Sequence, residues 1–169
     1  SCVEQTSSKK VNVGSTEQTV EIIESVIDLK GKKIGYCTPS LNAPYYQALL
    51  QSIQSTVENN GMIFLSADGQ NDINKQIAAV EDLITKGVDV LLLNPKDPDA
   101  LVGVTKIAKA AGIPVFIIDS SIDPSADFVT TIQSNNLANG ELAGEWVAKK
   151  FGSKKMNIAL LSGNAGNPV

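Results

Sequence analysis

The chain has 169 residues, enough for one domain, or for one domain and part of another. A formal net charge of −4 and a sequence pI near 4.8 argue against a nucleic-acid-binding surface, and no apolar run approaches the ~18 residues of a transmembrane helix. The chain has no histidine and only two cysteines, which excludes histidine-based catalysis, histidine metal ligands and multi-thiolate metal sites.

Three helical runs each end at a glycine that is followed at once by a short apolar run, at Gly61, Gly87 and Gly112. A glycine just past a helix end adopts the left-handed conformation that caps the last carbonyls. The alternation of strand, helix, glycine and strand predicts an α/β fold in which helices wind around a parallel sheet. After a polar segment at 1–31, with an amphipathic stretch at 17–29, we expect strands at 33–37, 62–66, 88–93, 115–118, 128–132 and 158–161, and helices at 44–60, 73–84, 99–111 and 137–151.

Local signals indicate how these elements begin and which faces they bury. Pro44 suits the first turn of a helix, and Asp72 is expected to cap the next helix. Cys37, at the end of an apolar strand, is predicted to be a buried small hydrophobe. In the last helix, helical spacing predicts that Trp146, together with Leu142 and Val147, points into a core.

Sheets of this kind bind ligands at the carboxyl ends of their strands. The loop after the first strand, 38–46, has no glycine to admit a pyrophosphate and no acidic residue for aspartyl-phosphate chemistry, which argues against nucleotide-binding and phosphoryl-transfer functions. Instead it offers Tyr45 and Tyr46 beside small polar groups, a combination that suits a sugar. The alternative is that these rings only pack at the helix start. Neighbouring helical residues point about 100° apart, so the two rings cannot play the same role.

Polar residues also follow the third and fourth strands. Asp119 is placed to accept hydrogen bonds from two ligand hydroxyls, or alternatively to cap a turn, because Asp123-Pro124 nearby is a turn signal. Asn94 is expected to brace the neighbouring loops. Asp97 and Asp99 are interpreted as turn and cap residues rather than metal ligands.

Five segments carry a resemblance in register: 41–46, 72–83, 92–95, 113–119 and 134–136. Their order and spacing resemble the ribose-binding type of periplasmic sugar-binding protein, the receptor component of ABC transporters, over about residues 32–169. The resemblance implies a doubly wound parallel sheet of flavodoxin-like order, the periplasmic binding protein type 1 fold. It implies a first lobe at 32–133, then a hinge and the incomplete start of a second similar lobe at 134–169, with the ligand between the lobes.

The same resemblance implies the residues that contact the ligand. The two aromatic rings would sandwich a sugar, the acid after the fourth strand would take its hydroxyls, and the hinge would contribute an amide. The implied set is Asn42, Tyr45, Tyr46, Asp119, Ser120 and Asn135. Ribose-binding members carry Arg in place of Ser120 and Asn in place of Ala43, so a ligand other than ribose is expected. Binding would occur by domain closure, with no catalytic residue, metal or cofactor.

The polar segment 1–31 is interpreted as a tether. Cys2 at its head is typical of a bacterial lipoprotein anchor, which would follow a cleaved signal peptide; an incidental cysteine is the alternative. The whole predicts an extracytoplasmic, membrane-anchored lipoprotein, at the cell surface or in the periplasm, that binds a sugar or polyol and delivers it to an ABC permease.

A second class of function shares this fold. The chain would then be the ligand-sensing domain of a transcription regulator, or an extracellular receptor, including one for a quorum signal. A regulator needs a basic DNA-binding segment before the first strand, whereas 1–31 has few lysines and no arginine. Because the chain is expected to stop within the second lobe, unpaired strand edges and apolar patches also predict self-association of this fragment.

Overall fold

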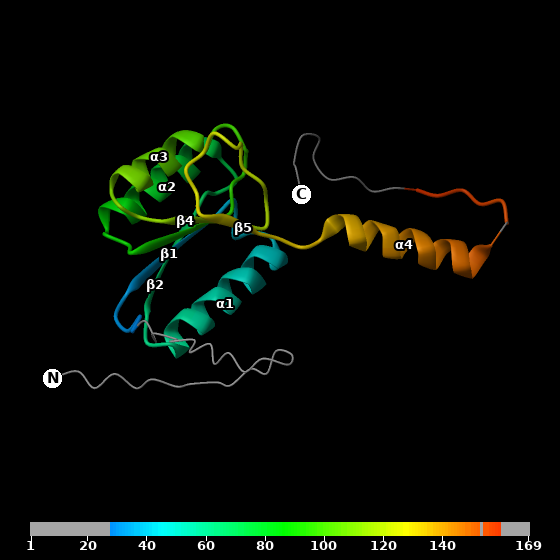
Figure 1. The fold of residues 1–169 in the computed structure, drawn as a ribbon, viewed down its shortest axis with the longest axis horizontal. Helices are drawn as coiled ribbons and strands as arrows, with labels where there is room; N and C mark the ends of the chain where they lie inside the picture. Colours follow the sequence, from blue (N-terminus) through cyan, green and yellow to red (C-terminus); the bar gives the residue numbers. More distant parts are fainter. Residues whose placement is uncertain (1–27, 153, 160–169) are drawn as a thin grey trace, which may run out of the picture.

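The computed structural model describes residues 28–152 and 154–159, so Cys2 and most of the 17–29 stretch lie outside the described residues. Strands and helices alternate as expected (Figure 1). Their bounds are β1 (Lys33–Thr38), α1 (Pro44–Asn59), β2 (Ile63–Asp68), α2 (Ile73–Thr85), β3 (Val90–Leu93), α3 (Val102–Ala110), β4 (Val115–Ile118), β5 (Thr130–Ile132) and α4 (Asn136–Phe151).

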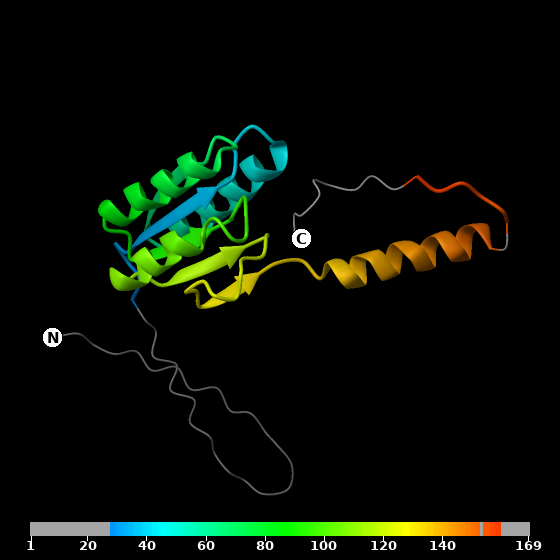
Figure 2. The same ribbon diagram turned by 90° about the horizontal axis from the view of Figure 1, so that it is seen from above.

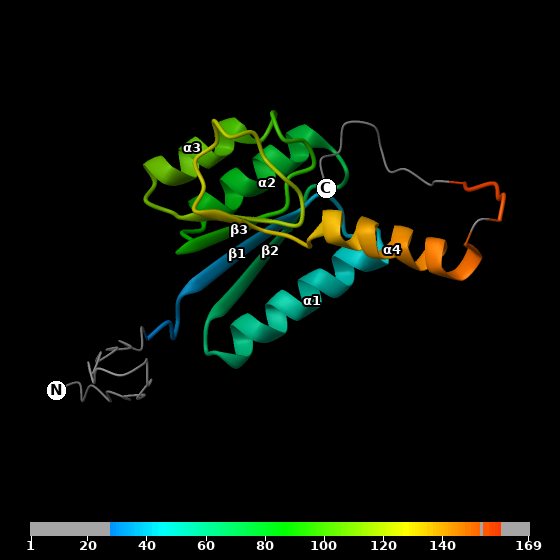
Figure 3. The ribbon, with the colours of Figure 1, turned by 45° about the vertical axis from the view of Figure 1, so that its right-hand side comes forward.

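The five strands form one parallel sheet in the order β2-β1-β3-β4-β5, which confirms the predicted α/β fold class. Helices α2 and α3 cover one face of the sheet and α1 covers the other, as Figures 1 and 3 show. The register aligns Cys37 with Leu93, and Leu93 with Ile117. The ends of the strands therefore meet along one side, which we call the carboxyl edge.

The predicted turning points of the chain are confirmed. Gly61, Gly87 and Gly112 have φ angles of 74°, 68° and 74°, in the left-handed region that a side chain rarely tolerates. Asp72 caps α2, since its Oδ1 accepts a hydrogen bond from the Lys75 amide at 2.9 Å. The predicted glycines thus follow the ends of α1, α2 and α3, and the predicted aspartate begins α2.

The main core lies between the sheet and helices α2 and α3. It is built by buried apolar side chains from both layers, among them Val80, Leu83, Leu91, Leu93, Val104, Val115 and Ile117. Cys37 belongs to this core as predicted, and burial raises the pKa of its thiol to about 12. By contrast, Val57 is the only residue that α1 buries.

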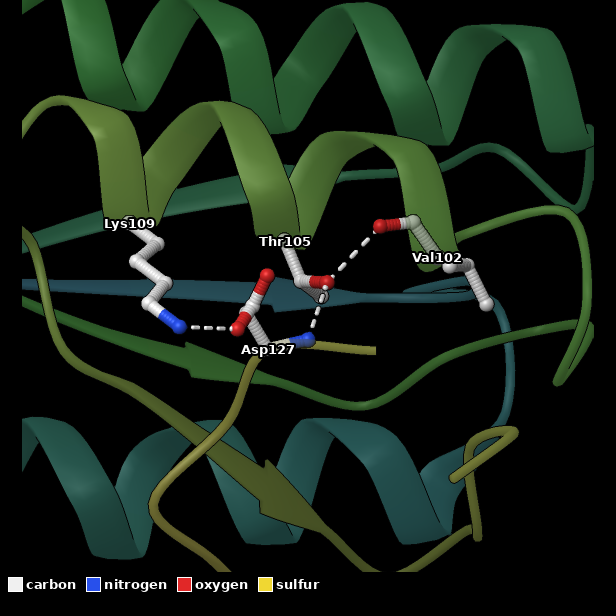
Figure 4. A network of polar contacts seen from close by, with 4 residues as sticks. All are labelled: Val102, Thr105, Lys109 and Asp127. Carbon is white, nitrogen blue, oxygen red and sulfur yellow. Dashed lines mark hydrogen bonds and ion pairs between the residues drawn. The ribbon is translucent and has the colours of Figure 1, made fainter. Parts of the chain in front are cut away.

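A polar network fastens α3 to the segment that leads into β5 (Figure 4). The buried Thr105 hydroxyl donates to the Val102 carbonyl at 2.7 Å and accepts from the Asp127 amide at 3.0 Å. The Asp127 carboxylate pairs in turn with Lys109. This network lies before β5, at the end of the sheet opposite the carboxyl edge.

Several boundaries differ from the predicted ones. Helix α3 begins at Val102 rather than residue 99, because Asp97 Oδ1 accepts the Asp99 and Ala100 amides, at 3.0 and 2.8 Å, and holds a turn there. Strands β3 and β5 each begin two residues later than expected. Of the strand expected at 158–161, Ile158 and Ala159 have no strand structure, and 160–161 lie outside the described residues.

The core position predicted for Trp146 is wrong. Helix α4 extends away from the layered unit, as Figures 1 and 2 show, and buries no residue. Trp146 is 56% exposed and Leu142 is 64% exposed, and Val147 is only partly buried. Helical spacing identifies an apolar face, but no described element packs against this one. Within the described ranges, no helix has the length and apolar character needed to cross a membrane.

Candidate ligand-binding site

Two residues singled out from the sequence meet at the carboxyl edge. The Tyr45 hydroxyl, at the start of α1, donates a hydrogen bond of 2.7 Å to Asp119 Oδ1, just after β4. They lie 74 positions apart in the sequence, and the parallel register brings the loops that carry them to the same side of the sheet. This pair forms the centre of the candidate site.

Asp119 is held in a restrained conformation. Its φ angle is +68°, which is uncommon for a residue other than glycine. Its amide donates to the Ile132 carbonyl at 2.8 Å, and its Oδ2 accepts from Asn94 Nδ2 at 3.3 Å. Backbone strain of this kind tends to gather at functional sites. The Asp119 carboxylate therefore contacts the side chains of Tyr45 in α1 and of Asn94 after β3. The nearby turn is stabilised by Asp123, whose Oδ1 accepts the Ser125 amide at 2.8 Å.

The two tyrosines have different surroundings, as the helix geometry predicts. Tyr45 is 56% exposed and Tyr46 is partly buried. Their rings meet edge to face, with centroids 5.4 Å apart and planes at 67°. The hydrogen bond to Asp119 raises the pKa of Tyr45 to about 12, because the carboxylate stabilises the protonated phenol. An aromatic surface therefore stands beside a carboxylate at the edge of the sheet.

Asn94 braces the loops around this pair, as predicted. The backbone N–H of Asn94 donates to the Cys37 carbonyl at 2.9 Å, and the backbone carbonyl of Asn94 accepts from Gln76 Nε2 at 2.7 Å. Gln76 Oε1 also accepts the Lys96 amide at 2.9 Å. Sequence reasoning missed Gln76. The available signal was a polar residue on the otherwise apolar face of a helix, where a buried amide must satisfy neighbouring backbone groups.

Tyr36 and Thr38 were also missed. Both are fully buried in β1, and because Cys37 between them belongs to the core under α2 and α3, their side chains point to the opposite face of the sheet, toward α1. Within the described part of the chain, Tyr36 Oη, Thr38 Oγ1 and Asn94 Oδ1 have no hydrogen-bond partner. Burial raises the pKa of the Tyr36 hydroxyl, and the nearby Thr38 and Asn94 side chains act in the opposite direction. The signal for Tyr36 was a polar hydroxyl in a strand that is otherwise apolar, whereas Thr38 was assigned to the loop and belongs to β1 in the structure.

The other predicted site residues lie on the loops around this centre. Asn42 is exposed, and its amide donates to Ser40 Oγ at 3.1 Å. Ser120 is buried directly after Asp119. Asn135 is exposed and caps α4, since its Oδ1 accepts the Ala138 amide at 3.0 Å. Among the described bonds, none joins Asn42, Ser120 or Asn135 to the Tyr45–Asp119 pair, so their contact with a ligand stays a prediction.

The chain is similar to known proteins over most of its length. A protein-family model described as "periplasmic binding protein domain" matches residues 34–169. The ribose import binding protein of Bacillus subtilis is 38% identical over 133 residues, and the galactofuranose-binding protein of Escherichia coli is 32% identical over 138 residues. An ABC transporter solute-binding protein of Mycobacterium smegmatis, solved with bound glycerol, is 33% identical with a TM-score of 0.76.

These matches cover most of this chain but less than half of each relative. The alignment takes in 79% and 80% of the chain for the two curated relatives, and 43% of each of them. For the solved structure the shares are 81% of this chain and 47% of the other. The relatives' names are those of solute-binding proteins, which does not favour the regulator or receptor alternative.

Proposed function

The chain belongs to the periplasmic binding protein domain family, and from this membership we propose that the complete protein is the solute-binding component of an ABC import system, taking up a sugar or polyol. The observation that carries the proposal is the Tyr45–Asp119 pair at the carboxyl edge. A carboxylate braced by Asn94 accepts hydrogen bonds from ligand hydroxyls, and an adjacent aromatic ring covers the apolar face of a sugar.

Binding, not catalysis, is the proposed activity. The site offers one restrained acceptor, Asp119, and aromatic surface from Tyr45 and Tyr46. The Tyr45 hydroxyl occupies part of the acceptor capacity of the carboxylate, which has about four lone-pair positions. Ligand hydroxyls would take the remaining positions, and a second lobe would close over them by a hinge movement that includes Asn135. We propose Asn42 and Ser120 as further polar contacts.

The ligand is proposed to be a sugar or polyol other than ribose. Ser120 and Ala43 have short side chains where ribose-binding members carry longer hydrogen-bond donors, so the hydroxyls of ribose would lack partners. The relatives include a galactofuranose-binding protein as well as a ribose-binding one. We therefore place furanose sugars and small polyols first among the candidates.

The segment before the first lobe is proposed to be a tether. Cys2 would carry the lipid, residues 3–31 would form the spacer, and a cleaved signal peptide would precede them. More than one acyl chain is needed for stable membrane attachment. The complete protein would then work outside the cytoplasm beside its permease. Detergent partitioning and mass spectrometry of the N-terminal peptide from the native host test this, and an unmodified Cys2 in the aqueous phase would contradict it.

A direct test of function uses the complete protein and its Asp119→Asn variant. Thermal shift and titration calorimetry would screen pentoses, hexoses, small polyols and methyl furanosides. We expect a ligand other than ribose, and a loss of about 2–3 kcal/mol of binding free energy in the variant, because Asn accepts fewer and weaker hydrogen bonds. Asp89→Asn, on the opposite edge of the sheet, is the matched control and should bind as the parent does. Equal ligand affinity in the Asp119→Asn and Asp89→Asn variants would show that Asp119 is not part of the binding site.

The chain of 169 residues is proposed to self-associate. Exposed apolar side chains lie along α4 and around β5, namely Val129, Ile132, Leu137, Leu142 and Trp146. Surfaces of this kind favour association in water. Light scattering should show a dimer or larger species, and Trp146→Lys should reduce it. A monomer at all concentrations would contradict this proposal.

A further inference from the structure

Three buried polar atoms lie behind Asp119 without a partner in the described part of the chain: Tyr36 Oη, Thr38 Oγ1 and Asn94 Oδ1. Their residues are all fully buried. Buried polar groups in native proteins are almost always hydrogen-bonded, to protein or to ordered water. A group of three such atoms at one place therefore requires an explanation.

The sheet brings the three residues together on one face. Tyr36 and Thr38 are two positions apart in β1, so their side chains share the face toward α1. The register pairs Cys37 with Leu93, so Thr38 and Asn94 follow as neighbours on adjacent strands. The Thr38 and Asn94 side chains lie near enough to the Tyr36 hydroxyl to lower its pKa as hydrogen-bonding neighbours, against the larger effect of burial, although neither forms a hydrogen bond of normal geometry with it. The three atoms thus border one small polar region.

Asp119 fixes the orientation of the Asn94 side-chain amide. An ionised carboxylate only accepts hydrogen bonds, so the Asn94 group facing Asp119 Oδ2 at 3.3 Å is the donor Nδ2. The acceptor Oδ1 is then the unpartnered atom. It needs a donor, and among the described residues the only other buried side-chain polar atoms without a partner are the hydroxyls of Tyr36 and Thr38.

We propose that an ordered water molecule lies among Tyr36, Thr38 and Asn94, and that Tyr36 and Thr38 are positioning residues for Asp119. The water accepts a hydrogen bond from the Tyr36 hydroxyl and donates to Thr38 Oγ1 and to Asn94 Oδ1. These three bonds give each orphaned atom a partner, and three is the usual number for a buried water. The water fixes the Asn94 amide, which in turn holds the Asp119 carboxylate toward the ligand.

The first test compares Thr38→Val with Thr105→Val in the complete protein, because both threonines are fully buried. Thr105 bonds only within the α3 network, away from the carboxyl edge. If the water is present, Thr38→Val lowers the melting temperature and Thr38→Ser restores it, since serine keeps the hydroxyl. Should Thr38→Val or Tyr36→Phe instead raise the melting temperature, the hydroxyls are simply unpaired and the proposal fails. This test needs no ligand, so it stands even if the proposed function is wrong.

The second test measures positioning and rests on the proposed function. With ribose, L-arabinose and a methyl galactofuranoside as probes, Tyr36→Phe and Thr38→Val should weaken binding roughly three- to tenfold, and Thr105→Val should leave it unchanged. In an Asp119→Ala background, Tyr36→Phe should change the affinity less than about twofold, because its effect passes through Asp119. Equal losses in both backgrounds would show a general structural role and overturn the positioning role.

A crystal structure of the ligand-free complete protein supplies a third readout. Electron density for one water within hydrogen-bond distance of the three atoms is expected, and its loss in Thr38→Val would agree with the melting data. If the parent protein binds none of the probes, the proposed function fails while the water is still tested by the density and by the melting temperatures. The proposal would be overturned if no water density lies among the three side chains, or if they form hydrogen bonds directly with one another.

Discussion

The two faces of the sheet are both covered by helices, yet they are built from different residues. Toward α2 and α3 the strands present buried apolar side chains such as Leu91, Leu93 and Ile117. Toward α1, the carboxyl half of the face presents Tyr36, Thr38 and Asn94. One face is an ordinary close-packed core, and the other carries polar atoms that have no hydrogen-bond partner among the described residues.

The two faces of this sheet are therefore expected to serve different purposes, one stabilising the fold and the other binding the ligand. The apolar face supplies the burial that holds the fold. The α1 face leaves polar groups near the edge where Asp119 and Tyr45 meet. Substitutions on the first face should therefore change the free energy of unfolding, and substitutions on the second should change ligand affinity more than stability.

The largest effect is expected for Leu91→Ala on the apolar face. Leu91 is fully buried, so the variant loses its transfer free energy and leaves a cavity, at a cost of about 2–5 kcal/mol of unfolding free energy. Leu142→Ala, on the exposed face of α4, should cost close to nothing. Urea denaturation of this chain measures both. Similar losses in the two variants would remove the contrast on which the comparison depends.

Gln76→Met is expected to have the next largest effect. Methionine matches the length of Gln76, but it leaves the Asn94 carbonyl and the Lys96 amide unpaired in a buried site. The expected loss is about 1–3 kcal/mol of unfolding free energy. Gln51→Met, at an exposed position of α1, is the matched control. A Gln76 variant as stable as its control would show that this amide does not hold the loop after β3.

The sequence alone predicted the α/β fold because each turning point has a local cause. A glycine after a helix and an aspartate before one fix where the chain reverses, and parallel pairing then follows from the alternation. The juxtaposition of Tyr45 and Asp119 was predictable for the same reason, since strand ends in such a sheet share one edge.

What the sequence could not give depends on neighbours distant along the chain. In the sequence Tyr36 resembles an ordinary strand residue and Thr38 the first residue of a loop, and only the register sets them beside Asn94. Trp146 lies on an apolar helical stripe, but periodicity cannot say what covers that stripe. The sequence likewise does not show that the Tyr45 hydroxyl lies within hydrogen-bond distance of Asp119, because that depends on the orientation of the side chain.

A smaller effect should appear in the titration of the tyrosines, which all belong to the α1 side or the carboxyl edge. The pKa values of Tyr36, Tyr45 and Tyr46 are all raised, that of Tyr45 to about 12. Because the folded pKa lies above the ordinary value near 10, the linked stability is full below pH 10 and is lost as pH rises through the folded pKa. Absorbance at 295 nm should show phenolate forming later in the native protein than in urea.

Asp119→Asn provides the diagnostic variant for that titration. It removes the carboxylate that holds the Tyr45 proton, so one of the three ionisations should move down toward pH 10. Asp97→Asn, which changes a turn on the same side of the sheet, should leave the curve unchanged. If the native and unfolded curves coincide, the Tyr45–Asp119 hydrogen bond does not persist in solution.

The smallest effect is expected at the opposite edge, for Asp89→Asn. Asp89 accepts hydrogen bonds of 2.8 Å from Lys32 Nζ and from the Lys33 amide, and these lower its pKa. A lowered folded pKa gives stability that is present above the ordinary value near 4 and is lost as pH falls through the folded value. The variant should therefore melt slightly below the parent at pH 7, and the two should converge near pH 2. The pair is solvent-exposed, so added salt should also narrow the gap. Asp99→Asn, an exposed aspartate outside any described ion pair, should show no such gap. A gap for Asp89→Asn that persists into acid would mean that its backbone contact, rather than its charge, stabilises the start of β1.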